Sequence, residues 1–259
     1  MRRPCWSELM ALNIDSPGED SFFGMHSIKP VGYGGATGDG TLDLVGFDVE
    51  IVDERTLRFW LINQRPPVDA NKKYLDPKKI GGKRNCGCRK EFDLLIGGGN
   101  VAYCASSGTC HPTTANKLFF FSNGLTRGAD GLVYVPSSLT DGAQVMRLNP
   151  NGILELLDVI KLGILVDSLA VYKKGDIYAA GLPKFLEIIG TMDDPFGKDA
   201  PSTVWRITRD VNGYTAEKIL EDKEKRILSG VTTARHDVKT RRLSMGAALT
   251  PYMMICDPK

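Results

Sequence analysis

Two oxygen-bearing residues stand at equivalent places in two similar stretches of the chain. Asn123 begins the stretch NGLTRGADGLVYVPSS and lies 11 residues before Tyr134, while Asp167 begins DSLAVYKKGDIYAAGL and lies 11 residues before Tyr178. Amide and carboxylate oxygens are ligands that calcium takes in proteins, usually about six to eight of them. Calcium held there could bind a substrate's carbonyl oxygen and stabilise the oxyanion that forms when water attacks. The alternative is that both side chains only cap turns at strand starts.

The elements that would position these residues form a repeat. A third copy, TARHDVKTRRLSMGAAL, begins at Thr233, which lies 11 residues before Ser244. Each copy has a polar start, a short strand, a charged or glycine-containing turn and a second strand. Further strand pairs follow, as in QVMRLNPNGILELLDVI and TVWRITRDVNGYTAEKIL, and LPKFLEIIGTMDDPFGKDAPS is an insertion between the second and third copies. Four strands in each unit of about 40–45 residues are typical of a β-propeller.

The N-terminal part fits this repeat less well. A looser copy, DLVGFDVEIVDERTLRFWLIN, lies around residues 42–61, and residues 81–99, GGKRNCGCRKEFDLLIGGG, form an atypical insert that fits no blade. The sequence therefore predicts one all-β domain over residues 1–259. We expect a six-bladed β-propeller type that is incomplete, with about four to five blades, the best-formed blades over 99–259, and a poorly defined segment over 1–40. A helical or mixed α/β fold remains the alternative, but no long stretch has the helical period and caps.

Composition excludes several other classes. The net charge of +2 on 259 residues favours neither nucleic acid nor an acidic membrane as a partner. The most apolar window, ILELLDVIKLGILV, is interrupted by three charged residues, so no transmembrane segment is expected. The basic N-terminus lacks the apolar core of a signal peptide. There is no Gly-x-Ser-x-Gly or P-loop motif, and GYGGATGDG lacks the strand-and-helix context of a dinucleotide site.

Several stretches together resemble one family. FSNGLTRGADGLVYVPSS, MRLNPNGILELLDVIKLGILVDSLAV, GDIYAAGLPK, TTARHDVKTRRLSMG and PYMMICDP are similar to the serum paraoxonase/arylesterase family, specifically its fungal-type relatives. That family belongs to the gluconolactonase- and strictosidine-synthase-like propellers. The resemblance implies a six-bladed propeller that hydrolyses aryl esters and lactones, in a secretory or extracellular setting. It also implies two calcium ions in the tunnel, one structural and one that contacts the substrate's carbonyl oxygen while a histidine pair helps to activate water.

The resemblance assigns metal ligands at three positions. Asn123 matches the catalytic-calcium asparagine of a Phe-x-Asn-Gly motif. Asp167 matches the aspartate of a Val-Asp-Asn motif, whose asparagine is replaced here by Ser168, a weaker oxygen ligand. The family's first calcium carboxylate lies in an N-terminal blade that this chain does not contain. Its Pro-Asn-Asn motif, which should fall near residues 81–99, is also missing.

The histidine pair of the family is not kept. Val45 occupies the position of the first histidine and Gln64 that of the second, and neither side chain can shuttle a proton at neutral pH. The catalytic residues are therefore left unassigned, and weak or no activity is expected. The leading interpretation is a calcium-dependent hydrolase of a small ester or lactone. The alternative is a non-catalytic propeller that serves as a binding scaffold.

The remaining histidines show no metal-ligand spacing. His236 follows a predicted strand, His111 lies in a loop-like stretch, and His26 lies in a segment without a repeat. A solvated or hydrogen-bonded role is the favoured interpretation for His236.

The six cysteines permit several interpretations. Cys104 and Cys110 flank a turn of small residues, where a short-loop disulfide is possible in an oxidising compartment. A zinc site that joins them to Cys86 and Cys88 fits no common module. The resemblance implies that Cys256 pairs with an N-terminal cysteine, for which Cys5 is the candidate, although the segment around Cys5 does not resemble the family.

Overall fold

The computed structural model separates the chain into two compact units, Met1–Arg89 and Lys90–Lys259. It describes residues 8–14, 24–28, 44–51, 53–63, 101–104, 110–113, 124–137, 141–150, 153–172, 174–248, 250 and 253–258. The described parts of both units are mostly β-strand, so the prediction of an all-β chain is confirmed at this level. The insert over 81–99 lies outside the described residues.

The N-terminal unit contains two antiparallel strand pairs. Strand β1 (Leu9–Leu12) pairs with β2 (Met25–Ile28), and β3 (Leu44–Ile51) pairs with β4 (Leu57–Asn63). The first pair is what the structure describes of residues 1–40. The second coincides with the looser copy of the repeat.

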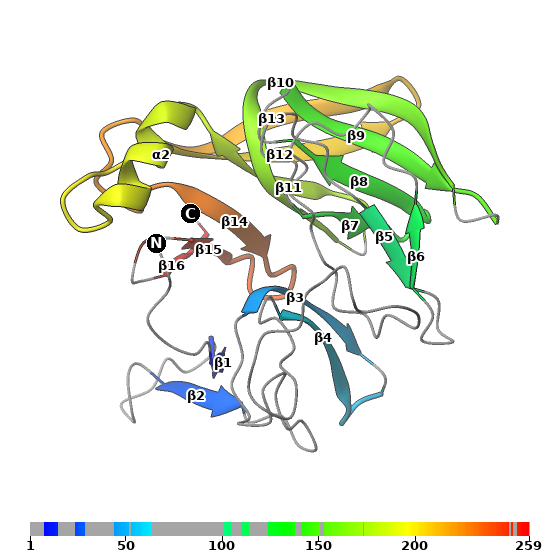
Figure 1. Cartoon of the computed structure of the whole chain (residues 1–259), viewed down its shortest axis with the longest axis horizontal. Coiled ribbons are helices and arrows are strands. Elements are labelled where there is room, and N and C mark those ends of the chain that lie inside the picture. The colour runs from blue at the N-terminus through cyan, green and yellow to red at the C-terminus, as the bar shows by residue number, and fades with distance from the viewer. Residues whose placement is uncertain are drawn as a thin grey trace, which may run out of the picture. The chain divides into compact units, whose positions relative to one another are not determined.

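The C-terminal unit contains most of the described strands (Figure 1). Strands β5 (Val101–Cys104) and β6 (Cys110–Thr113) form a hairpin. Seven strands form one antiparallel sheet in the spatial order β13-β12-β11-β10-β9-β8-β7. Their bounds are β7 (Thr126–Arg127), β8 (Leu132–Pro136), β9 (Asp141–Leu148), β10 (Leu154–Val171), β11 (Ile177–Leu182), β12 (Ser202–Asp210) and β13 (Gly213–Asp222). A second sheet has the order β14 (Val231–His236), β15 (Leu243–Ala247) and β16 (Met254–Cys256).

Strand β10 joins two four-stranded meanders. Its first part, Leu154–Ile160, pairs with β9, and its last part, Leu165–Val171, pairs with β11. The crossing between the two parts is held by the carboxylate of Asp141, which accepts backbone N–H groups from Leu162 and Gly163 at 2.8 and 2.7 Å. One meander is therefore β7-β8-β9 with the start of β10, and the other is the end of β10 with β11-β12-β13.

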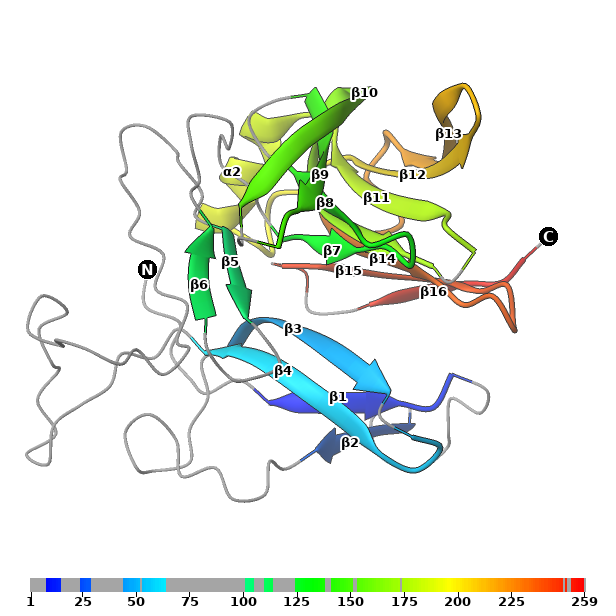
Figure 2. The same cartoon turned by 90° about the vertical axis from the view of Figure 1, so that its right-hand side faces the viewer.

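Strand β11 of the second meander is buried on both of its faces. All six residues of β11 are buried, and because side chains alternate along a strand they enter two different cores. Ile177 and Ala179 pack with Tyr134 and Val145 of the first meander, among other apolar residues. The intervening side chains, Tyr178 and Ala180, pack in a core that also contains Val231, Leu228, Ala234 and Met245. Figure 2 shows β14 to β16 as a separate layer beside β11, so three β-layers lie face to face in this unit.

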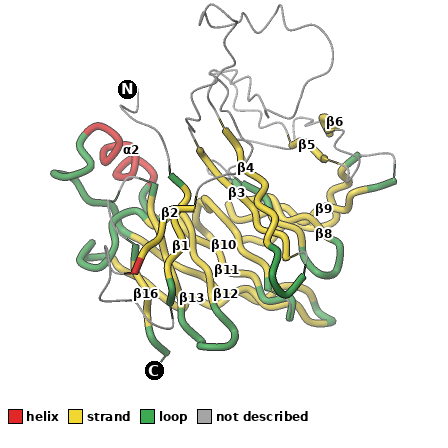
Figure 3. The backbone as a smooth tube through the Cα atoms, turned by 90° about the horizontal axis from the view of Figure 1, so that it is seen from below, coloured by secondary structure: helices red, strands yellow, loops and turns green. Residues whose placement is uncertain are grey.

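Helix α2 (Phe185–Asp193) lies in the predicted insertion between β11 and β12 (Figure 3). Ile188 of the helix is buried with Leu182 and Ala200, which anchors the insertion to the end of β11. The Thr191 hydroxyl donates to the Ile188 carbonyl at 2.7 Å. The helix is therefore an addition to the β-fold, because β11 and β12 still pair directly with each other.

Candidate functional site

Asp167 and Ser168 lie at a β-bulge near the end of β10. Val166 pairs with Gly181, and Leu169 pairs with Ala179, so three steps along β10 face two steps along β11. A bulge of this kind adds one residue to a strand and re-aims the neighbouring side chains. The Val166 N–H donates to the Ser137 carbonyl at 3.1 Å, so the residue before the bulge is fixed to the first meander.

The bulge holds a buried carboxylate. Asp167 is 6 % exposed, and Ser168 is half-buried. A carboxylate at this depth is stable only with polar or ionic partners, and Asp167 does interact with a neighbour. The fold therefore keeps an acidic side chain inside the protein near the end of β10, where a smaller polar residue would be less costly to bury.

Gly124 lies next to this bulge. Its φ angle is +78°, and a Cβ atom built on it would be 3.8 Å from the Ser168 Oγ atom. Thr126 pairs with Tyr134, and Ala170 pairs with Tyr178. These two pairs occupy the same position in the two copies of the repeat. Gly124, which lies just before β7, is thus the counterpart of Ser168. The structure brings these two counterparts together.

Asn123 itself lies outside the described residues, so its predicted place beside Asp167 stays a prediction. Among the described residues, no group of three or more His, Cys, Asp or Glu side chains could hold a metal ion. The donors in place are the Asp167 carboxylate and the Ser168 hydroxyl, both oxygens, which suits a hard cation such as calcium rather than a soft one.

Val45, at the position where the resemblance places the first histidine, also lies at a β-bulge. In the N-terminal unit Leu44 pairs with Asn63 and Gly46 pairs with Ile62, so Val45 is the extra residue of a bulge in β3. Val45 therefore occupies, in its own strand pair, the place that Asp167 has in β10. An alkyl side chain there cannot accept a proton. Gln64 lies outside the described residues.

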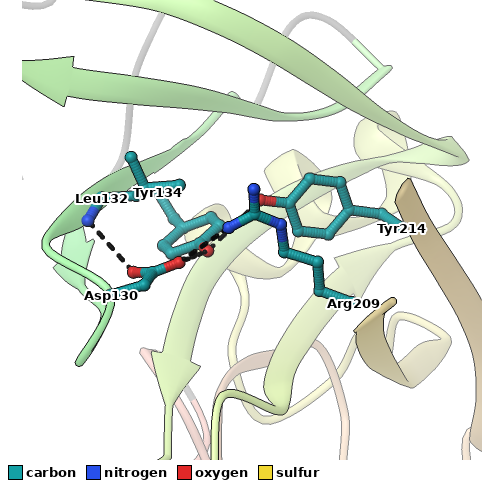
Figure 4. Close-up of polar contacts among 5 residues, drawn as sticks. All are labelled: Asp130, Leu132, Tyr134, Arg209 and Tyr214. Carbon is teal, nitrogen blue, oxygen red and sulfur yellow. Dashed lines mark hydrogen bonds and ion pairs between the residues drawn. The ribbon is translucent and has the colours of Figure 1, made fainter. Parts of the chain in front are cut away.

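A polar network that the sequence did not predict lies at the surface edge of the core that contains Tyr134 (Figure 4). The Asp130 carboxylate accepts the Tyr134 hydroxyl at 3.0 Å, the Arg209 Nη1 at 3.2 Å and the Leu132 N–H at 3.0 Å. The Tyr134 and Tyr214 hydroxyls are 3.3 Å apart. Burial, followed by the bond to Tyr214, raises the pKa of Tyr134 far above its usual value. The Asp-Gly of the turn before β8 was the available signal, because an aspartate there can cap the turn and receive a distant arginine.

A shallow hollow of about 220 Å³ adjoins this network. Asp158, Asp210, Arg209 and Tyr214 contribute its polar lining, together with apolar side chains such as Leu157. The Arg209 guanidinium is already paired with Asp130 and also lies 5.5 Å from the centre of the Tyr214 ring. This arrangement ties the β12–β13 hairpin to the first meander, which is a structural role.

His236 lies in an aromatic cluster between two β-layers. Its ring stacks on Tyr178, with centroids 4.9 Å apart and planes inclined by 6°, and Tyr172 meets both rings edge-on. Burial raises the pKa of Tyr172 to about 12. The sequence favoured a solvated or hydrogen-bonded role for His236, and the structure adds a packing contact between β11 and β14. His26 is exposed on β2, and His111 lies on β6 opposite Tyr103.

The cysteines are only partly described. The backbone register of the β5–β6 hairpin places Cys104 directly opposite Cys110. Cys256 on β16 is bonded to no other described cysteine, and burial raises the pKa of its thiol. Cys5, Cys86 and Cys88 lie outside the described residues, so the Cys5–Cys256 pairing and the zinc alternative stay untested.

Comparison of the chain with models of known protein families finds no match, and comparison with curated proteins finds none either. No helix among the described residues combines the length and the apolar character that crossing a membrane requires.

Proposed function

We propose that this chain is a calcium-binding β-propeller of the six-bladed paraoxonase/arylesterase type, with an incomplete set of blades, that hydrolyses small esters or lactones. The path of β10 supports the fold. In a propeller the outer strand of one blade leads into the inner strand of the next, as β10 leads from the β9 side to the β11 side. The burial of β11 between two other β-layers supports it as well.

The observation that carries the proposal is the buried Asp167 at the bulge of β10, with Ser168 beside Gly124. On this proposal the Asp167 carboxylate is the charged ligand of calcium, and the Ser168 hydroxyl and the Asn123 amide oxygen are neutral ligands. The absent Cβ of Gly124 leaves room on the β7 side of Ser168.

Each group has a separate role in the proposed chemistry. Calcium, when bound, polarises the substrate's carbonyl group and stabilises negative charge on its oxygen. Asp167 holds and orients the ion from inside the protein, where low polarity strengthens the attraction between opposite charges. Val45 and Gln64 move no proton, so the acceleration of about 10²–10⁴ that a positioned acid or base supplies is lost. Slow turnover is therefore expected.

Hydrolysis of phenyl acetate and of a panel of γ- and δ-lactones, measured with calcium present, tests the enzymatic proposal. The Asp167→Ala variant should lose turnover. The control is Asp158→Ala, which removes an exposed carboxylate from the same strand and should keep it. No turnover by the natural chain, or turnover that survives Asp167→Ala, would overturn the enzymatic proposal.

A non-catalytic binding scaffold is the second candidate, and Val45 favours it. The bulge of β3 carries an alkyl side chain at the place where the resemblance puts a catalytic histidine. A scaffold would bind a lactone or ester in the presence of calcium without converting it. Equilibrium dialysis followed by mass analysis of the recovered ligand separates the two candidates, because only the enzyme returns hydrolysed product.

A further inference from the structure

Strand β14 begins with the same backbone feature as the Asp167 segment. Val231 pairs with Ala247, and Thr233 pairs with Gly246, so two steps along β14 face one step along β15. Thr232 is the extra residue of this bulge. The residue before each bulge is a fully buried valine: Val166 is 0 % exposed and Val231 is 1 % exposed.

The ladder beyond the bulges fixes the correspondence. Leu169 pairs with Ala179 and Ala170 with Tyr178, while Ala234 pairs with Met245 and Arg235 with Ser244. Counting back from these pairs makes Thr232 the counterpart of Asp167 and Thr233 the counterpart of Ser168. Sequence spacing instead predicts Thr233 as the counterpart of Asp167. That prediction is wrong by one position, because the turn between β14 and β15 is one residue longer than the turn between β10 and β11.

The bulge of β14 is firmly held at its first residue. The Val231 N–H donates to the Ser202 Oγ atom at 2.9 Å, and the Ser202 hydroxyl donates to the Leu228 carbonyl at 2.6 Å. Ser202 belongs to the meander that contains Asp167, so this bond ties the start of β14 to the preceding layer. Strand β14 packs against both β10 and β11.

The hydroxyl of Thr232 is only weakly engaged. Its hydrogen bond to the Gly246 carbonyl is 3.5 Å long, at the outer limit of such contacts. Since the hydroxyl is the donor there, its oxygen lone pairs remain able to accept or to ligate. Gly124, just before β7, and Ser168, near the end of β10, show that counterparts in successive copies of the repeat lie close together.

We propose that Thr232 is a further member of the oxygen site at Asp167, where its hydroxyl supplies a neutral oxygen ligand to the cation. This inference rests on the proposed function, because it assumes that calcium binds at Asp167. Asp167 and Thr232 would then be counterpart residues from two successive layers.

The test is the calcium affinity of Thr232→Val, measured by titration calorimetry. Valine keeps the branched shape and removes only the hydroxyl, so we expect the dissociation constant to rise about 3- to 10-fold, the equivalent of one polar contact. Thr215→Val makes the same chemical change at an exposed position of β13 and should leave the affinity unchanged. Thr232→Ser, which keeps the hydroxyl, should bind calcium like the natural chain, and this distinguishes a ligand from a packing residue.

The failure of this inference differs from the failure of the proposed function. If the natural chain binds calcium, Asp167→Asn abolishes binding and Thr232→Val binds as tightly as the natural chain, Thr232 is not a ligand and the proposed calcium site stands. If Thr232→Ser weakens binding as much as Thr232→Val, packing explains the effect and the inference is overturned. If the natural chain does not bind calcium, both are overturned.

Discussion

Gly124 lies against Ser168, with a position for Cβ only 3.8 Å from the serine Oγ atom, although 44 residues separate them in the chain. The two residues are counterparts in successive copies of one repeat, and their contact connects the segment just before β7 with the end of β10. The polar residues that precede them, Asn123 and Asp167, are the ones that the sequence singles out as cation ligands. The contact between Gly124 and Ser168 therefore supports the proposal that the repeat brings the cation ligands together.

Replacement of Ser168 by asparagine should strengthen calcium binding. An amide oxygen is a better calcium ligand than a hydroxyl, and the missing side chain of Gly124 leaves space next to this position. The dissociation constant, measured by titration with a calcium-sensitive dye as competitor, should fall for Ser168→Asn and rise for Ser168→Ala. Equal affinities in the two variants would show that the residue after Asp167 does not face the ion.

The crossing of β10 depends on Gly142 and tolerates change at Gly163. Both glycines have positive φ, +74° and +70°, so alanine at either position carries a backbone strain of about 1 kcal/mol. A Cβ on Gly142 would also collide with the Ile160 carbonyl oxygen, whereas nothing lies within 4 Å of a Cβ on Gly163.

We therefore expect Gly142→Ala to destabilise the fold by roughly 2–4 kcal/mol and Gly163→Ala by about 1 kcal/mol. Urea unfolding followed by circular dichroism measures both values. Similar losses in the two variants would contradict the close approach of β9 and β10 at the crossing.

Tyr172 makes stability depend on pH in the alkaline range. Burial raises its pKa from 10.0 to about 12, so the unfolded chain ionises this tyrosine at a lower pH than the folded protein does. Its contribution is therefore present below about pH 10 and is lost as the pH rises towards about 12. The free energy of unfolding of the natural chain should fall relative to that of Tyr172→Phe between about pH 9 and about pH 11. A constant difference between the two proteins would show that Tyr172 is solvated.

The β5–β6 register predicts a disulfide between Cys104 and Cys110 in oxidising conditions. Directly opposite residues in an antiparallel pair have Cα atoms about 4.5–5.5 Å apart, within the usual range for a disulfide. Mass spectrometry of a proteolytic digest without reductant should recover the two cysteines in one cross-linked peptide pair after cleavage between them. Alkylation of both thiols in protein that was oxidised and never reduced would contradict the prediction.

The sequence carried most of the information about the described strands and much less about the site. Short apolar runs separated by glycine-containing turns predicted the β-strands of the C-terminal half, because a strand needs only a few apolar residues to reach a core. Equal spacing predicted that Asp167 and the Asn123–Gly124 segment are counterparts. Equal spacing failed to predict that Thr232 is the counterpart of Asp167. The turn between β14 and β15 is one residue longer, which changes the distance in the sequence but not the pairing of the strands.

The polar and aromatic clusters could not be predicted from local patterns. Arg209 reaches Asp130 from a strand 79 residues away, and His236 stacks on Tyr178 across two layers. Such contacts depend on how layers pack, and that information is spread over the whole chain. A short sequence motif contains too little information about layer packing to predict which charged or aromatic residues come into contact.

The central claim is that calcium binds at Asp167 in the folded protein. The most direct measurement is the melting temperature of the natural chain and of Asp167→Asn, each in excess calcium and in excess chelator. At a calcium concentration about 100 times the dissociation constant, binding stabilises the fold by about 2.7 kcal/mol. Calcium should therefore raise the melting temperature of the natural chain by several degrees and leave that of Asp167→Asn unchanged. A natural chain that melts at the same temperature in calcium and in chelator would contradict the claim.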